Sequence, residues 1–256
     1  MKAIMLIGGL GTRLRPLTLT TPKPLLPIEN QPFLAYQLAF LHRYGFQEII
    51  LCTSYRSEEF HKTLGDGSRY GVKLHYVHEK APLGTGGAIK NAEIHVDNTV
   101  LVCNGDILMD LNLEQLVDFH RHKKALATIA LTRVEDPTAY GVIQTDSAGR
   151  ILQFIEKPAP EEVVSHMINA GVYVFEKEVF AMIPQGSVCS VERDIYPQML
   201  AQKDPFFALH LAGYWLDVGT LEKYHQAQHD VKAGRYPYRP VQKRAARKTK
   251  SRKAAA

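Results

Sequence analysis

The sequence predicts an α/β fold with a mostly parallel central sheet flanked by helices, and three observations support this. Short apolar runs alternate with segments of helical periodicity through the first half of the chain, a pattern typical of strand–helix–strand units. The first apolar run ends at a polar, glycine-rich loop. The 256 residues are 45% hydrophobic, which is enough for one domain with a sizeable core.

The first predicted strand is Lys2–Ile7, whose continuous apolar side chains indicate burial on both faces. A helix follows at Phe33–Tyr44, because Leu34, Leu38 and Leu41 share one helical face. The alternation continues with strands at Glu48–Thr53, Val72–Val77, Thr99–Cys103 and Leu126–Thr132, and with helices at Ser57–Leu64, Gly87–Ile94 and Asn112–Lys123.

The pattern changes after Tyr140, where strand-like segments come closer together. We interpret these segments as insertions that build one wall of a pocket on the same sheet. The predicted strands are Gly141–Thr145, Ile151–Ile155, Gly171–Phe175 and Phe206–Leu209, and the predicted helices are Lys177–Met182, Val191–Gln202 and Leu221–Ala233.

The positive charge of the chain is concentrated at its end. The formal net charge is +5, yet residues 235–256 contain nine Lys and Arg and no acidic residue, so residues 1–234 carry a net charge of −4. We therefore expect one folded domain over residues 1–234 and a basic, disordered tail over residues 235–256. Nucleic-acid binding by the tail is the alternative, but we expect no nucleic-acid partner.

Several features predict a cytoplasmic protein. No apolar stretch is long enough to cross a membrane, no signal peptide is recognisable, and the three cysteines are dispersed, which suits a reducing compartment. The eleven histidines are scattered as well. The densest group, around His120 and His122, is expected to be solvated on an exposed helix rather than to bind metal.

The loop Gly8–Thr18 is the most informative segment. Its glycines allow backbone N–H groups to approach phosphate oxygens. Leu14 stands where a dinucleotide fingerprint needs its third glycine, which disfavours a dinucleotide-dependent oxidoreductase. The Gly-Lys-Ser/Thr ending of a P-loop is also missing. Arg13 and Lys23, the latter between two prolines, add cations suited to a triphosphate.

The run Gly-Gly-x-Gly-Thr-Arg-Leu-Arg-Pro-Leu-Thr, followed by Pro-Lys-Pro-Leu-Leu-Pro, resembles the signature of the sugar-phosphate nucleotidyltransferases, or nucleotide-sugar pyrophosphorylases. This resemblance implies a Rossmann-like fold and an enzyme that joins a nucleoside triphosphate to a sugar 1-phosphate and releases pyrophosphate. Further segments resemble the family in the same order, over about residues 1–232: Gly84–Ile89, Asn104–Asp106, Tyr140–Val142, Phe154–Pro158, Asn169–Tyr173 and Tyr214–Thr220.

The resemblance also implies roles for individual residues. Catalysis would depend on Arg13, Lys23, Asp106 and Lys157. The nucleotide site would comprise Gly8, Gly9, Gly11, Thr12, Arg13, Lys23, Glu79, Gly84 and Asp106. The sugar-phosphate site would comprise Gly141, Glu156, Lys157 and Asn169. Mg²⁺ or another divalent cation would be held by Asp106 and Asp217.

The choice of base is predicted from Glu79, which stands five residues before Gly84. An ionised carboxylate only accepts hydrogen bonds; guanine offers it two adjacent donors, whereas uracil and thymine pair poorly with it. The alternative is an exposed glutamate at a strand end. The run Ser190–Pro197 resembles the mannose-1-phosphate guanylyltransferase branch of the family, which implies GTP and mannose 1-phosphate as substrates.

Other functions stay open at this point. A heptose or another hexose 1-phosphate, with GTP, dTTP, UTP or CTP, is one alternative. A regulatory subunit that binds nucleotide-sugars without turnover is another, although Arg13, Lys23, Asp106, Lys157 and Asp217 are all present and favour an active enzyme. We expect a homo-oligomer, namely a dimer. No hexapeptide repeat follows Gly234, so we expect a short form without the left-handed β-helix of longer members.

Overall fold

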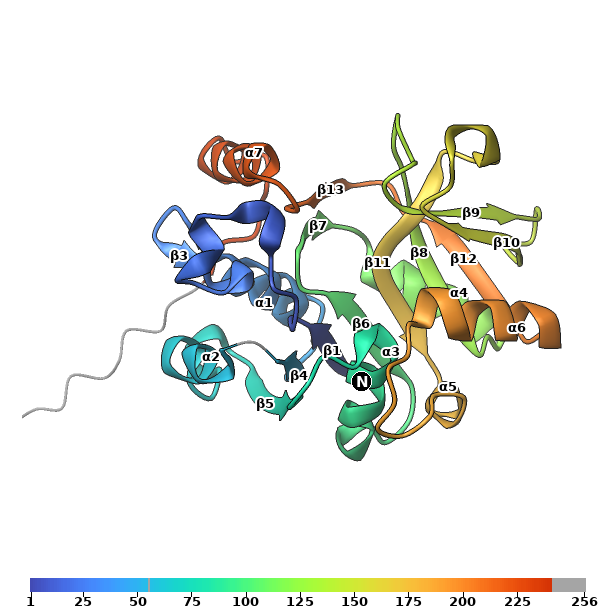
Figure 1. Ribbon diagram of the computed structural model, residues 1–256, viewed down its shortest axis with the longest axis horizontal. Coiled ribbons are helices and arrows are strands. Elements are labelled where there is room, and N and C mark those ends of the chain that lie inside the picture. The colour runs from blue at the N-terminus through green and yellow to red at the C-terminus, as the bar shows by residue number, and fades with distance from the viewer. Residues whose placement is uncertain (55, 241–256) are drawn as a thin grey trace, which may run out of the picture.

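A nine-stranded sheet forms the centre of the computed structural model, which describes residues 1–54 and 56–240. Its strands follow the order β5-β4-β1-β6-β11 (Figure 1). Strand β11 pairs with β6 and then β9 along one edge and with β8 along the other, and β10 and β12 extend these branches. The strands of this sheet are β1 (Lys2–Leu6), β4 (Glu48–Thr53), β5 (Lys73–His78), β6 (Val100–Asn104), β8 (Ala127–Arg133), β9 (Gly141–Thr145), β10 (Ile151–Glu156), β11 (Met167–Phe175) and β12 (Phe206–His210).

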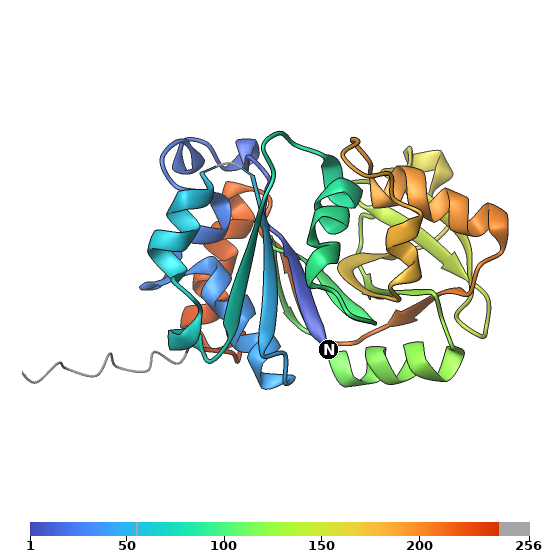
Figure 2. The ribbon, with the colours of Figure 1, turned by 90° about the horizontal axis from the view of Figure 1, so that it is seen from below.

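Helices cover both faces of this sheet. The helices of the fold are α1 (Phe33–Arg43), α2 (Ser57–Leu64), α3 (Gly84–Ala92), α4 (Leu113–Lys123), α5 (Glu178–Ala181), α6 (Tyr196–Gln202) and α7 (Leu221–Lys232). Helix α7 packs on two short strands outside this sheet. Ala3 and Met5 of β1 belong to the core cluster shared with α1 and α2, whereas Ile4 belongs to the cluster shared with α3 and α6. Figure 2 shows α1 and α2 on one side of β1, β4 and β5 and α3 on the other. The burial of β1 on both faces, predicted from its apolar run, is confirmed.

The parallel part of the sheet creates the site. Strand β1 is parallel to β4 and β6, and β4 is parallel to β5. The chain moves outward from β1 to β4 and β5 and then returns to β6 on the opposite side of β1. The carboxyl ends of β1 and β6 are therefore adjacent at a point where the strand order reverses. Open α/β sheets bind their ligands at such a point.

Two small sheets and several short helical turns complete the fold. The sequence did not predict the antiparallel pairs β2 (Pro27–Ile28) with β3 (Gln31–Pro32) and β7 (Ile107–Asp110) with β13 (Tyr214–Asp217). The short turns are 3₁₀ helices η1 (Thr12–Leu14), η2 (Leu17–Leu19), η3 (Lys23–Leu25), η4 (Ser68–Tyr70), η5 (Glu93–His95) and η6 (Pro160–Glu162), and the π-helical turn η7 (Val191–Ile195). The pairing of β7 with β13 brings two distant parts of the chain to the carboxyl end of β6.

The expectation that His120 is solvated is wrong. Its side chain is only 1% exposed, because the last turn of α4 packs against the sheet. The imidazole Nδ1 lies 2.8 Å from Thr128 Oγ1, and Nε2 lies 3.0 Å from Glu176 Oε1. His122 is exposed, as expected.

The first residues of the predicted tail lie against the domain. Tyr236 is 1% exposed, with its ring 6.2 Å from that of Tyr36, and the Tyr238 hydroxyl donates a hydrogen bond to Asp110. The predicted domain boundary at residue 235 therefore falls within the packed part of the chain, because the ring of Tyr236 belongs to the apolar cluster beside α7 and the ring of Tyr238 packs against it. The rest of the predicted tail, residues 241–256, lies outside the described residues. Among the described helices, none is long and apolar enough to cross a membrane.

Candidate active site

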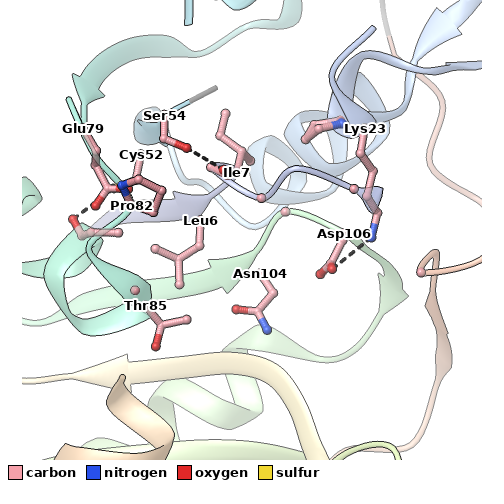
Figure 3. Close-up of a pocket in the computed structure, with 18 of the residues that line it drawn as sticks. Leu6, Ile7, Lys23, Cys52, Ser54, Glu79, Pro82, Thr85, Asn104 and Asp106 are labelled. Carbon is pink, nitrogen blue, oxygen red and sulfur yellow. Dashed lines mark hydrogen bonds and ion pairs between the residues drawn. The ribbon is translucent and has the colours of Figure 1, made fainter. Parts of the chain in front are cut away.

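A pocket of about 490 Å³ opens at the carboxyl ends of β1 and β6. Residues from the glycine-rich loop, from the loop after β5, from the start of α3 and from the turn between β6 and β7 meet in its wall (Figure 3). The structure brings together all nine residues predicted for the nucleotide: Gly8, Gly9, Gly11, Thr12, Arg13, Lys23, Glu79, Gly84 and Asp106. Their common position is a structural finding, whereas their roles remain predictions.

Hydrogen bonds from two side chains hold the glycine-rich loop in shape. The Ser54 hydroxyl donates to the carbonyl of Gly8 over 2.5 Å, and the Thr18 hydroxyl donates to the carbonyl of Gly11 over 2.8 Å. Gly11 has a φ of +61°, and a Cβ there would lie 3.1 Å from Lys23 Cβ. The loop is thus fixed before any ligand binds, which reduces the entropy that binding has to overcome.

Lys23 is a buried cation at the pocket wall. Its side chain is 10% exposed and its Nζ lies 3.0 Å from Asp106 Oδ2. The flanking residues Pro22 and Pro24 restrict the backbone that presents it. A buried ammonium paired with a single carboxylate keeps two N–H donors for an anionic ligand.

Asp106 and Asp217 form a pair of carboxylates, because β13 pairs with β7 and the Val218 amide donates to the carbonyl of Asp106 over 2.9 Å. Burial, and then the negative charge of Asp106, raises the pKa of the Asp217 carboxyl, while Lys23 and Arg13 oppose that rise. Asp217 Oδ1 is buried, and no hydrogen-bond partner reaches it within residues 1–54 and 56–240.

This donor set fits a divalent cation of the magnesium type. Carboxylate oxygens are the preferred ligands of Mg²⁺, which often uses one or two of them together with phosphate oxygens and water. The partnerless Oδ1 of Asp217 is the atom that such an ion would satisfy. The described part of the chain holds no group of three or more His, Cys, Asp or Glu arranged for a metal, so phosphate and water would complete the coordination.

Sequence reasoning did not single out Gly219, which also lines the pocket. A Cβ at this position would lie 2.9 Å from Arg13 Nη2 and 3.1 Å from both carboxylate oxygens of Asp217. The guanidinium and the carboxylate therefore both occupy the space that a side chain would take. Its place two residues after Asp217 was the available signal. Thr85, which lines the same pocket, lies in the segment Gly84–Ile89 that resembles the family, but it was not named for the site. Ser54 had no comparable signal.

Glu79 lies at the opposite end of the pocket from Lys23 and Asp106 (Figure 3). It is 7% exposed, and its Oε1 is buried with no partner among the described residues. Burial raises the pKa of its carboxyl. The residue is not the exposed strand-end glutamate that was the alternative, and it offers an unsatisfied acceptor to a ligand.

The glycines at the start of α3 serve packing as well as the pocket. Gly84 lines the pocket, but a Cβ there would lie 2.5 Å from the carbonyl oxygen of Cys189. The amides of Gly86 and Gly87 donate to that same oxygen over 2.9 and 3.4 Å. Two N–H groups in the first turn of α3, those of Gly86 and Gly87, are therefore partnered within the protein and are not free to bind phosphate.

The residues predicted for the sugar phosphate lie outside the lining of this pocket. Strands β9 and β10 place Gly141 opposite Glu156, and a Cβ on Gly141 would lie 3.0 Å from Glu156 Oε2. The next residue, Lys157, has a φ of +52°, and its amide donates to the carbonyl of Tyr140 over 3.0 Å. A non-glycine residue in this region is strained, which is a feature common at functional sites.

Asn169 connects this area with the pocket. Its Nδ2 donates to the Tyr173 hydroxyl over 2.9 Å, and its Oδ1 accepts from the Gly171 amide over 2.8 Å. A Cβ on Gly171 would in turn lie 2.8 Å from Nδ2 of Asn104, a residue of the pocket wall. The predicted sugar residues and the nucleotide pocket are thus neighbours on the same sheet.

Comparisons with known proteins agree with the resemblance seen in the sequence motifs. A family model described as nucleotidyl transferase matches residues 2–234. The mannose-1-phosphate guanylyltransferase of Mycobacterium tuberculosis is 45% identical over 237 residues, which cover 92% of this chain and 66% of that protein. The UTP–glucose-1-phosphate uridylyltransferase of Synechocystis is 40% identical over 241 residues, covering 89% and 62%. The chain thus spans about two thirds of the length of these relatives.

A solved structure shows the same fold over nearly its whole length. HddC from Yersinia pseudotuberculosis, crystallised in complex with GMP-PN, superimposes with a TM-score of 0.78 at 29% identity. The match covers 90% of this chain and 99% of that one. The sheet order, the pocket at its switch point and the family match therefore agree on one fold, as the sequence predicted.

Proposed function

The chain belongs to the nucleotidyl transferase family, and from this membership we propose that it transfers a guanylyl group from GTP to mannose 1-phosphate, forming GDP-mannose and pyrophosphate. The observation that carries the proposal is the pocket wall: Lys23 and Asp106 lie at one end and the unsatisfied carboxylate of Glu79 at the other. This arrangement suits a molecule with a phosphate end and a base end.

The proposed reaction joins two polyanions. A phosphate oxygen of mannose 1-phosphate attacks the α-phosphorus of GTP, a new P–O bond forms, and the P–O bond to pyrophosphate breaks. The attacking oxygen is already an anion, so no general base is required. Catalysis would then depend on positioning and on electrostatic stabilisation.

The cations of the site would have separate tasks. Arg13, held against Gly219, would bind the triphosphate and stabilise the charge that passes to pyrophosphate. Lys23, already buried, would neutralise the reacting phosphates. Lys157 would bind the phosphate of the sugar and aim it at the α-phosphorus, while Glu156 and Asn169 would accept or donate hydrogen bonds to sugar hydroxyls.

Members of this family generally use a divalent metal, and we propose Mg²⁺ for this chain. Asp106 and Asp217 would hold it, because their carboxylates are adjacent and Asp217 Oδ1 lacks a partner among the described residues. When bound, the ion would supply positive charge at the α-phosphate.

Glu79 supports guanine as the base. Its buried Oε1 could accept from the N1–H and 2-amino donors of guanine, which together would satisfy a carboxylate. The complex of HddC with GMP-PN is consistent with a guanine nucleotide. The uridylyltransferase relative from Synechocystis keeps UTP open as the alternative.

The Glu79→Gln variant tests the base assignment. A glutamine presents both a donor and an acceptor, so the preference for GTP over UTP and dTTP in kcat/KM should fall by roughly tenfold or more. Glu114→Gln, an exposed position on α4, is the matched control and should keep the wild-type preference. Better use of UTP or dTTP than of GTP by the wild type would contradict the assignment.

The sugar is proposed to be mannose because the Mycobacterium tuberculosis relative is named for mannose 1-phosphate. Heptose and other hexose 1-phosphates are the alternatives. Pyrophosphate release, measured for GTP, dTTP, UTP and CTP against several sugar 1-phosphates, tests both substrates together. We expect the highest kcat/KM for GTP with mannose 1-phosphate. No pyrophosphate release with any pair would favour a regulatory subunit that binds nucleotide-sugars without turnover.

Two further expectations can be tested alongside. A cytoplasmic location is supported by three cysteines that are free and buried, as in a reducing compartment: Cys52, Cys103 and Cys189. The expected homodimer stays a prediction, which light scattering of the purified chain would test.

A further inference from the structure

Glu192 lies in the turn η7, which packs against the start of α3. Its Oε2 accepts a hydrogen bond from the Thr85 hydroxyl over 2.7 Å and another from the Ser190 hydroxyl over 2.8 Å. The Thr85 oxygen in turn accepts from the Val191 amide over 3.0 Å. Thr85 is part of the wall of the nucleotide pocket, so this carboxylate is tied to that wall through one side chain.

The segment that carries Glu192 is held firmly. The Cys189 amide donates to the carbonyl of Leu83 over 2.9 Å, and the Cys189 carbonyl accepts from two amides of α3. The turn itself is π-helical, a conformation often found at functional sites. Ser190 and Asp194 bond reciprocally across its start, because the Asp194 amide donates to the Ser190 carbonyl over 2.9 Å and the Ser190 amide donates to Asp194 Oδ2 over 2.7 Å.

The second oxygen of Glu192 is available for a ligand. Within the described part of the chain, Oε1 accepts no hydrogen bond, and the residue is partly exposed. Burial raises the pKa of the Glu156 carboxyl, and the negative charge of Glu192 raises it further. Helix α6 follows η7 directly and packs against β10, where the Tyr196 ring lies 5.1 Å from the ring of Phe154, two residues before Glu156. Glu192 and Glu156 therefore lie in the same region, on the sugar side of the site.

We propose that Glu192 is a specificity-determining residue of the sugar subsite, and that its bond to Thr85 couples this subsite to the nucleotide pocket. The inference rests on the proposed function, since it takes a sugar 1-phosphate as the ligand. Sugar hydroxyls are donors that two neighbouring carboxylates can share, which relieves the repulsion between Glu156 and Glu192. When nucleotide binding moves Thr85, its hydrogen bond to Oε2 would turn the carboxylate of Glu192. Oε1, the oxygen proposed to contact the sugar, would then move as well.

Glu192→Gln tests the sugar contact. The amide keeps the shape of the side chain and one oxygen for Thr85, but it loses the charge. KM for mannose 1-phosphate should rise roughly tenfold or more, as for loss of a hydrogen bond to a charged group, while KM for GTP changes much less. Glu178→Gln, an exposed position on α5, is the matched control and should behave as the wild type. Equal kinetics for the two variants, or equal increases in both KM values, would overturn the proposal.

Thr85→Val tests the coupling, because valine keeps the volume and removes the hydroxyl. The combined Thr85→Val and Glu192→Gln variant should lose little more kcat/KM for mannose 1-phosphate than the worse single variant. Fully additive losses would overturn the coupling. Circular dichroism melts would show that each variant is folded.

A binding measurement separates this inference from the proposed function. Trp215 is the single tryptophan, and its Nε1 donates to the carbonyl of Ala170 beside Asn169, so its fluorescence should report mannose 1-phosphate without turnover. Weaker binding to Glu192→Gln than to Glu178→Gln supports the inference even if no pyrophosphate is released. Equal binding overturns it even if the wild type turns over.

Discussion

The proposed nucleotide side and the proposed sugar side of the site, called the nucleotide side and the sugar side below, are built in different ways. On the nucleotide side, the residues follow the carboxyl ends of the parallel strands β1, β4, β5 and β6. On the sugar side, they come from β9, β10 and β11, whose antiparallel pairing decides which side chains are neighbours. Local loop chemistry specifies the glycine-rich part of the first side, whereas the second side depends on strand register.

The two sides also differ in charge and in how firmly they are fixed. Hydrogen bonds from Ser54 and Thr18 and the ion pair of Lys23 with Asp106 fix the nucleotide side around cations. The sugar side places Glu156 and Glu192 near each other, and a strained Lys157 follows directly. We infer that the nucleotide side is prepared for a polyanion, while the sugar side is completed by the hydroxyls and phosphate of its ligand.

The largest effect is expected on the nucleotide side, at Asp106. Asp106→Asn removes one of the two carboxylates proposed to hold the metal and the partner of Lys23. Turnover should fall by a factor on the order of a hundred to a thousand, with little change in melting temperature. Asp118→Asn on the exposed face of α4 is the control. Near-wild-type kinetics for Asp106→Asn would rule out the assignment of Asp106 as a metal ligand.

A smaller effect is expected from Gly219→Ala, which probes the nucleotide side alone. The added methyl would lie within about 3 Å of both the Arg13 guanidinium and the Asp217 carboxylate, so at least one must move. We expect kcat to fall roughly tenfold, since misplaced catalytic groups are costly, while KM for mannose 1-phosphate stays close to its wild-type value.

The control for this variant is Gly234→Ala, where a Cβ would meet no atom of the described residues within 4 Å. Its φ of +76° costs stability rather than activity. If both alanine variants lose activity in proportion to their melting temperatures, Gly219 has only a structural role.

The smallest effect is expected away from both sides, at His120. Burial lowers the pKa of His120, and its hydrogen bond to Glu176 only partly opposes this. Below about pH 6.5, the His120 imidazole therefore binds a proton more readily in the unfolded chain than in the folded chain. This contribution to stability is present above that pH and is lost as the pH falls.

Urea unfolding at neutral and at mildly acidic pH measures this contribution. The free energy of unfolding should decrease less with acidification in His120→Gln than in the wild type, and turnover at neutral pH should be unchanged. An identical pH dependence in the two proteins would show that His120 does not titrate as its burial implies.

The sequence could predict those parts of the site that are local in the chain, but not the contacts between distant segments. The loop residues from Gly8 to Lys23 could be assigned from turn chemistry and from the resemblance, because they lie close together in the chain. The approach of Asp217 to Asp106 could not, since it depends on the pairing of β13 with β7. Neither could the bond between Glu192 and Thr85, which joins residues 107 positions apart.

His120 is a different kind of error. Leu113, Leu116 and Val117 occupy the buried face of α4, and helical periodicity places His120 on that same face. The signal was present, but the neighbouring Arg121 and His122 suggested a solvated segment. The burial of Glu79 had no such signal, because it depends on how the end of β5 meets β4 and the start of α3.

The central claim is that mannose 1-phosphate, bound on the sugar side, attacks the α-phosphorus of GTP bound on the nucleotide side. Following the phosphate oxygens of mannose 1-phosphate into the products tests this claim most directly. The full chain would be incubated with GTP, Mg²⁺ and mannose 1-phosphate whose non-bridging phosphate oxygens are heavy-oxygen labelled, and the products weighed by mass spectrometry. The account predicts that all of the label appears in GDP-mannose and none in pyrophosphate. Label in pyrophosphate, or a product that has lost one labelled oxygen, would contradict it.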